Sequence, residues 1–138
     1  MKKFGFLIAA LVMLSLSSYA ESDSLKALKN APVIEFTELT HDYGTIKQQA
    51  DGSCEFVFKN NGKTPLILSN VQSSCGCTVP QWTREPIKKG ESGTIKVKYN
   101  TNNVGPFMKS ITVYSNATNN PIRLTIKGTV EAAAAAAQ

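Results

Sequence analysis

The sequence predicts an all-β domain in which antiparallel strands stack as two layers. Three observations support this prediction. From residue 32 onward apolar and polar residues alternate with a period of two, the alternating stretches are rich in β-branched and aromatic residues, and clusters of Gly, Asn and Pro separate them. No helical period precedes the C-terminal tail in this region, and a length of 138 residues suits one domain.

Residues 1–20 are interpreted as a secretory signal peptide. Lys2 and Lys3 form a positive start, Phe4 to Leu16 is apolar, and Ser18 to Ala20 matches a cleavage site with small residues. The apolar stretch is shorter than the about 20 residues that a membrane-spanning helix needs. We therefore expect cleavage after Ala20, a periplasmic or secreted protein, and no membrane span once the signal is removed.

Two short segments flank the predicted domain. Residues 21–31 are expected to be a linker, because the helix-compatible patch at Leu25 and Leu28 stops before Pro32 and is too brief to bury an apolar face. Residues 131–138 form an alanine-rich tail with high helix propensity. The tail is too short to hold a helix unaided, so we expect it to be frayed or to act as a tether.

The strands follow one another at short intervals. Between Cys54 and Lys59, the side chains of Cys54, Phe56 and Phe58 share one apolar face. Asn60 to Gly62 then predict a tight hairpin turn, because Asn and Gly tolerate positive φ angles. The expected strands are Val33–Phe36, Tyr43–Ile46, Cys54–Lys59, Leu66–Val71, Thr94–Tyr99, Ile111–Val113 and Ile122–Lys127.

About seven short strands with regular turn signals are typical of an immunoglobulin-like antiparallel β-sandwich. The segment from residue 32 to residue 130 has the size of such a domain, which is large enough to bury an apolar core. A β-barrel is the alternative architecture. Trp82 lies where no strand is evident, and we expect its large apolar surface to be buried.

The charge of the chain does not indicate a nucleic-acid partner. The formal net charge is +5, and removal of Lys2 and Lys3 with the signal leaves 13 basic and 10 acidic residues, a balance of +3. This is too small for the basic footprint of a nucleic-acid-binding domain. Lysines on the outer strand faces are explained by solubility and by protection of the sheet edges.

The candidate functional site is the segment Cys75-Gly76-Cys77-Thr78. Two thiols separated by one residue are close by covalent necessity, and Gly76 lets the backbone between them bend. Such a pair either presents both sulfurs to one soft ion or closes a readily reduced disulfide. Both interpretations are functional.

An odd number of cysteines leaves one thiol unpaired within a monomer. Cys54 either forms a disulfide with Cys75 or Cys77 across the predicted hairpin, which would contribute about 3 kcal/mol, or stays a small buried hydrophobe. The spacing is not that of structural zinc, and His41 is the single histidine. Copper(I) accepts two soft ligands, so Cys75 and Cys77, with Met108 as a third, are the candidate metal ligands and copper the one candidate cofactor.

The sequence does not favour an enzyme. A cysteine hydrolase would need a loop cysteine as nucleophile, His41 as base and Asp42 as the group that orients it. Paired-carboxylate motifs, a phosphate loop and a nucleophile elbow are all missing from the sequence.

Several motifs in order give the chain a resemblance to a known family. They are His41-Asp42-Tyr43-Gly44, Ser74-Cys75-Gly76-Cys77-Thr78, Pro80, Pro86-Ile87, Lys89-Gly90-Glu91-Ser92-Gly93, Gly105-Pro106-Phe107, Lys109 and Ser115-Asn116. Over His41 to Val130 the chain resembles the bacterial domain of unknown function 1573.

The resemblance implies an immunoglobulin-like sandwich on an exported protein, similar to Hydin-like modules, and no established activity. It places Cys75, Gly76, Cys77 and Thr78 on the family's signature, whereas Cys54 falls on no family motif. Lys89 stands where the family pattern has proline, a departure that loosens a turn.

The leading hypothesis is an exported, non-catalytic sandwich that binds or assembles with a protein or another envelope component through the Cys-Gly-Cys loop. The alternative is a periplasmic redox or copper-handling protein that uses Cys75 and Cys77 directly.

Overall fold

The computed structural model describes residues 19–134, in two units that divide after Asn30. The first unit holds helix α1 (Tyr19–Asn30), so the expected linker is helical in the structure. Its sequence contains alanine, leucine and lysine, which are good helix formers, and the helix ends before Pro32. Leu25 and Leu28 on this helix are exposed. Residues 1–18, which hold most of the predicted signal peptide, lie outside the described residues.

No helix among the described residues is long and apolar enough to cross a membrane.

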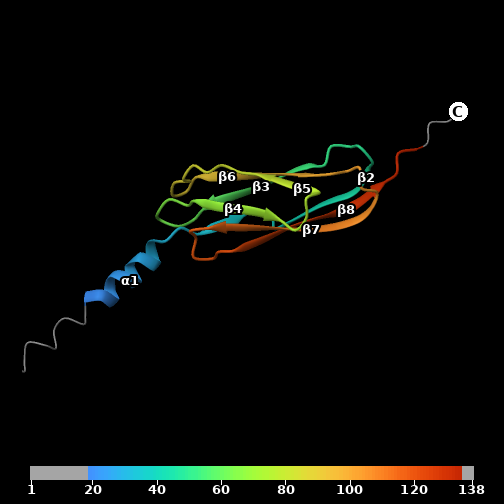
Figure 1. Cartoon of the computed structure of the whole chain (residues 1–138). Helices are drawn as coiled ribbons and strands as arrows, with labels where there is room; N and C mark the ends of the chain where they lie inside the picture. Colours follow the sequence, from blue (N-terminus) through green and yellow to red (C-terminus); the bar gives the residue numbers. More distant parts are fainter. Residues whose placement is uncertain (1–18, 135–138) are drawn as a thin grey trace, which may run out of the picture. The chain divides into compact units, whose positions relative to one another are not determined.

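The second unit is a β-sandwich of two four-stranded sheets (Figure 1). The first sheet has the order β1-β3-β6-β5 and the second has the order β2-β8-β7-β4. The strands are β1 (Ile34–Phe36), β2 (Thr40–Lys47), β3 (Ser53–Asn60), β4 (Leu68–Ser73), β5 (Thr78–Gln81), β6 (Ser92–Tyr99), β7 (Gly105–Ser115) and β8 (Ile122–Glu131). The predicted all-β sandwich is confirmed, with eight strands where about seven were expected.

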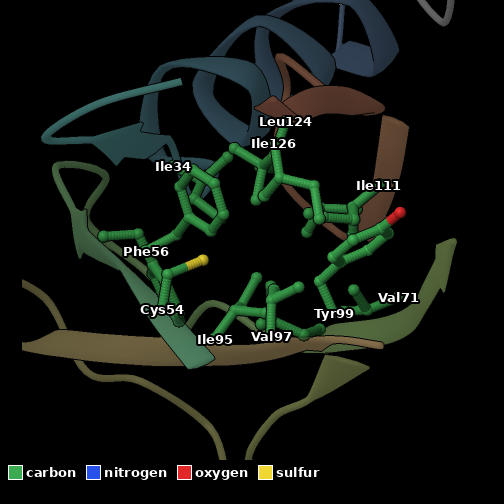
Figure 2. Packing of buried hydrophobic residues seen from close by; sticks show 14 of the residues in the cluster. Ile34, Cys54, Phe56, Val71, Ile95, Val97, Tyr99, Ile111, Leu124 and Ile126 are labelled. Atoms are coloured by element: carbon green, nitrogen blue, oxygen red, sulfur yellow. The ribbon is translucent and has the colours of Figure 1, made fainter. Parts of the chain in front are cut away.

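The core lies between the two sheets and comes from the alternating apolar positions. Phe56, Phe58 and Ile95 of the first sheet and Ile111 and Leu124 of the second are fully buried. Figure 2 shows side chains from the two layers pointing toward one another, with the Cys54 sulfur directed into the interior. Burying these side chains supplies most of the driving force for folding, at about 1.5–3 kcal/mol for each large apolar side chain.

The predicted hairpin between the strand of Cys54 and the strand of Leu68 is wrong. β3 pairs with β1 and β6, whereas β4 pairs with β7 in the other sheet. Asn60 does not turn a hairpin, because its fully buried side chain bonds the connecting segment instead. The chain therefore crosses between the sheets after Asn60.

Two further strand features differ from the expectation. β2 and β8 pair in parallel, whereas all pairs were expected to be antiparallel. β5 was not predicted, because Pro80 within it argues against a strand; as the edge strand of its sheet, β5 tolerates a residue that lacks an N–H donor. Ala132 to Ala134 of the predicted tail are not helical, and residues 135–138 lie outside the described part of the chain.

Candidate functional site

The Cys-Gly-Cys segment joins the edge strands of the two sheets. β4 ends at Ser73 on the edge of the second sheet, and β5 begins at Thr78 on the edge of the first. The loop therefore crosses one open flank of the sandwich. Gly76 at its centre is exposed, while Cys75 and Cys77 are partly buried.

Cys75 and Cys77 form a disulfide with a Cα–Cα separation of 5.4 Å. Of the alternatives that the sequence left open, the structure has the bond between the two loop cysteines and no bond from either of them to Cys54. A crosslink between residues only two positions apart removes little freedom from the unfolded chain, at most about 1.5 kcal/mol by the chain-entropy relation. Stabilisation of the fold is thus a weak explanation for this bond.

Hydrogen bonds that do not involve sulfur fix the backbone of the loop. The Ser73 hydroxyl lies 2.7 Å from the carbonyl oxygen of Cys75 and 2.8 Å from that of Thr78, so it spans the loop. The Ser74 N–H donates to the Ser110 carbonyl of β7 (2.9 Å), and the Asn100 N–H donates to the Cys77 carbonyl (2.8 Å). Both sheets therefore hold the loop independently of the disulfide.

Thr78 places a buried hydroxyl beneath the disulfide. Its side chain is 2% exposed, and its Oγ1 lies 4.0 Å from the sulfur of Cys75 and 3.9 Å from that of Cys77. A disulfide sulfur carries no hydrogen, so the hydroxyl is the donor in these weak contacts. Both cysteines are partly buried, and Cys77, unlike Cys75, packs against the core cluster.

Cys54 is a free, buried thiol, and the strand register separates it from the loop. Cys54 pairs with Val97 of β6, and Val97 pairs in turn with Pro80 of β5. Because Cys77 precedes β5, two strand spacings place the α-carbons of Cys54 and Cys77 at least about 10 Å apart, beyond the about 7 Å limit for a disulfide. The alternative in which Cys54 pairs with a loop cysteine is therefore wrong.

The Cys54 thiol instead belongs to a small polar cluster inside the sandwich. Burial raises the pKa of Cys54, and a hydrogen bond with the Tyr43 side chain opposes part of that rise. The Tyr43 hydroxyl donates to the carbonyl oxygen of Gly52 (2.7 Å). Burial, followed by the hydrogen bond with Cys54, raises the pKa of Tyr43 well above its usual range.

The structure does not bring the hypothetical hydrolase residues together. His41 and Asp42 lie on β2, and the loop follows β4 at the opposite edge of the same sheet, about 14 Å away across three strand spacings. The imidazole of His41 lies 3.5 Å from Glu38, and the Asp42 carboxylate accepts from the Gly44 N–H (2.8 Å). Asp42 thus bonds its own turn, and both loop cysteines are already bonded to each other.

Met108, the third candidate copper ligand, is exposed on β7, where it pairs with Lys127. Within residues 19–134 no group of three or more His, Cys, Asp or Glu side chains is arranged to hold a metal ion. The two sulfurs could serve a soft ion only after reduction, because a disulfide offers no thiolate.

Trp82 packs against the core and is partly buried, close to the expectation of burial. The Arg84 guanidinium lies 5.2 Å from the centre of its ring. The indole Nε1 is buried and has no hydrogen-bond partner among the described residues. The aromatic ring thus packs on the core and adds no reactive group to the loop.

Comparison with known proteins identifies a family. The family described as "Protein of unknown function (DUF1573)" matches residues 34–130, more than two thirds of the chain. The curated proteins contain no match to this sequence.

Solved structures share the fold at low sequence identity. A protein of unknown function from Porphyromonas gingivalis W83 is 18% identical with a TM-score of 0.63, covering 71% of this chain and 46% of its own, so this chain spans about half of its length. The ASH/PapD-like domain 7 of human CEP192 is 9% identical with a TM-score of 0.63, over 75% of this chain and 89% of its own.

The secreted serine protease VesC from Vibrio cholerae is 12% identical with a TM-score of 0.54, and the match covers 78% of this chain but 25% of the protease. These likenesses confirm the immunoglobulin-like sandwich and carry no function to this chain.

Proposed function

This chain belongs to the DUF1573 family of proteins of unknown function, and we propose that it is an exported binding or assembly module whose contact surface is the Cys-Gly-Cys loop. The partner class is a protein or another component of the cell envelope. The family match and the sandwich fold support a module without catalysis.

The observation that carries the proposal is the position of the loop between two edge strands. Gly76 is exposed, and Val79, which follows in β5, is 54% exposed despite its apolar side chain. Next to it, the outer face of the first sheet has a hollow of about 290 Å³ whose lining includes Val79, Lys98 and the ion pair between Lys96 and Glu55. An apolar side chain beside charged groups and a rigid loop is a surface on which a partner can dock.

The absence of an assembled nucleophile and base among the described residues also supports a non-catalytic role. His41 is separated from the loop by the width of a sheet, and the two loop sulfurs are joined. A hydrolytic mechanism needs a nucleophile and a base within hydrogen-bond reach.

A second candidate function is redox exchange at the loop, and the Cys75–Cys77 disulfide is the observation that favours it. Copper handling would require the reduced pair, so it belongs to the same redox cycle. Metal analysis of the reduced protein tests copper handling. Stoichiometric copper bound to the wild type but not to the C75S/C77S double variant supports copper handling, and no bound copper rejects it.

Site-specific photo-crosslinking in an exporting bacterial host tests the binding role. A photoreactive amino acid replaces Gly76 or, as a control on the outer face of β3, Val57. We expect position 76 to give a discrete adduct with an envelope component that excess unmodified protein suppresses, and position 57 to give none. Equal adducts at the two positions, or none at position 76, would reject the loop as the contact surface.

Export is checked on the same material. We expect the protein in the periplasmic or extracellular fraction to start at Glu21, with Lys2 and Lys3 removed. An uncleaved protein in the cytosol would reject the proposed location.

A further inference from the structure

We propose that the Cys75–Cys77 disulfide exchanges with a dithiol of an exported Cys-x-x-Cys protein, with Cys75 as the attacked sulfur and Thr78 as the residue that positions a hydrogen bond to the leaving sulfur of Cys77. This inference rests on the proposed role of the loop as the functional end of the module. It names the class of partner and the direction of attack.

The direction of attack follows from packing. Cys77 lies against the core cluster, whereas Cys75 does not belong to it. A thiolate that approaches from solvent therefore reaches the Cys75 sulfur, and the Cys77 sulfur becomes the leaving group. Thiol–disulfide exchange depends on access to the attacked sulfur and on how well the leaving thiolate is stabilised.

The reaction has two balanced steps. First, a partner thiolate attacks the Cys75 sulfur, the bond between the two loop sulfurs breaks, and the electron pair leaves on the Cys77 sulfur. Second, the partner's other cysteine, as a thiolate, attacks the sulfur of the partner's first cysteine in the mixed disulfide and releases the Cys75 thiolate. The loop gains two electrons and two protons, and the partner becomes a disulfide.

Thr78 stands where the leaving sulfur needs a donor. Its hydroxyl is 3.9 Å from the Cys77 sulfur and 4.0 Å from the Cys75 sulfur, and Thr78 is almost fully buried, so water does not compete for it. The hydroxyl can donate to either sulfur, and packing makes Cys77 the one that leaves. A hydrogen bond becomes stronger when its acceptor gains charge. The contact is weak in the disulfide and tightens as the Cys77 thiolate forms.

The loop is built to survive the change of redox state. The bonds from Ser73, Ser74 and Asn100 hold its backbone without using either sulfur. Reduction therefore leaves the thiols on the same frame, where the reverse reaction can close them again. Cys54 takes no part, because the strand register keeps it away from the loop.

The test uses the processed protein and thioredoxin as the probe. A thioredoxin variant that lacks its second active-site cysteine should be trapped as a mixed disulfide, and peptide mapping should place the bond on Cys75. Complete reduction by normal thioredoxin, followed by alkylation, should label both loop cysteines before Cys54. A mixed disulfide on Cys77, or a disulfide that reduced thioredoxin opens only after denaturation, would overturn the proposal.

The role of Thr78 has its own readout. T78V should slow reduction by about threefold and shift the alkylation of reduced Cys77 to higher pH, because the thiolate loses a charge-assisted hydrogen bond. T78S should restore both properties, and T94V on the outer face of β6 should change neither. A uniform loss of folding would instead lower the thermal midpoint of T78V, and an unchanged pH profile in folded T78V rejects the positioning role.

The two proposals can fail separately. If position 76 still crosslinks to its envelope partner in the C75S/C77S variant while thioredoxin fails to open the wild-type disulfide, then the binding role stands and the exchange is rejected.

Discussion

Replacement of the buried Asn60 by alanine should destabilise the sandwich by about 3 kcal/mol, which is an average of roughly 1 kcal/mol over the hydrogen bonds removed. The Asn60 side chain is fully buried and makes three hydrogen bonds. Its Nδ2 donates to the carbonyls of Thr64 (2.8 Å) and Ile87 (2.9 Å), and its Oδ1 accepts from the Gly62 N–H (2.9 Å).

The three bonds do not contribute equally. The Ile87 carbonyl also accepts from the Leu66 N–H (2.8 Å), so it keeps one partner in N60A. Gly62 is buried, and its N–H loses the Asn60 acceptor. An unpaired buried donor costs about 1–3 kcal/mol, so this group dominates the expected effect.

Urea denaturation, followed by the fluorescence of the single tryptophan, measures the change in the free energy of unfolding. In a thermal melt of a domain of this size, the midpoint of N60A should fall by roughly 10–20 °C. The N60D variant distinguishes the loss of hydrogen bonds from the loss of side-chain volume, because aspartate has nearly the volume of asparagine. Its carboxylate can still accept from the Gly62 N–H, but an oxygen replaces the amide nitrogen that donated to the carbonyls of Thr64 and Ile87. It should destabilise at least as much as N60A.

The matched control is N70A, which removes an exposed asparagine on β4 whose side chain bonds no other described residue. It should change the free energy of unfolding by less than about 0.5 kcal/mol. If N60A and N70A unfold at the same urea concentration, then Asn60 does not hold the crossing between the sheets and the reasoning is refuted.

Three further predictions concern the polar cluster, the disulfide and the core. The pKa values of Tyr43 and Cys54 are raised in the folded state, so the stability that these groups contribute is fully present below their pKa values in the unfolded chain and falls as pH rises above about 9. In urea denaturation, the double variant Y43F/C54A should therefore lose less stability between pH 8 and pH 10 than the wild type. C75S/C77S should cost at most about 1.5 kcal/mol in the same melts, and a much larger loss would contradict a local crosslink. G93A places a methyl group against the phenyl ring of Phe58 and should destabilise the domain by about 1–3 kcal/mol. An unchanged denaturation midpoint would show that the Phe58 ring moves aside freely.

The sequence predicted the strands well where alternation was strict. The alternation predicts that Phe56, Phe58, Ile95 and Leu124 are buried, and the structure confirms this. The alternation does not predict which strands are neighbours in a sheet. Alternation is a local property, whereas the choice between a hairpin and a crossing to the other sheet depends on distant groups such as the carbonyl of Ile87 that Asn60 bonds.

The candidate site was predictable as a motif but not as an arrangement. Cys75, Gly76, Cys77 and Thr78 stood out by residue type, yet three cysteines allow several pairings, and the register that separates Cys54 from the loop is not visible in the sequence. The anchoring of the loop also gave no signal, because Asn100 bonds Cys77 through backbone atoms that every residue has. The hydroxyls of Ser73 and Ser74, just before the motif, also anchor the loop, but nothing in their residue type predicts these contacts.

Stability and loop chemistry are separable in this molecule. The core and the buried Asn60 hold the sheets together, while the Cys75–Cys77 bond closes a turn that backbone hydrogen bonds already fix. Breaking a disulfide unfolds a protein when the bond restrains a long loop, and this bond spans two positions. The loop can therefore change its oxidation state while the edge strands on either side keep their positions, as the proposed thiol exchange requires.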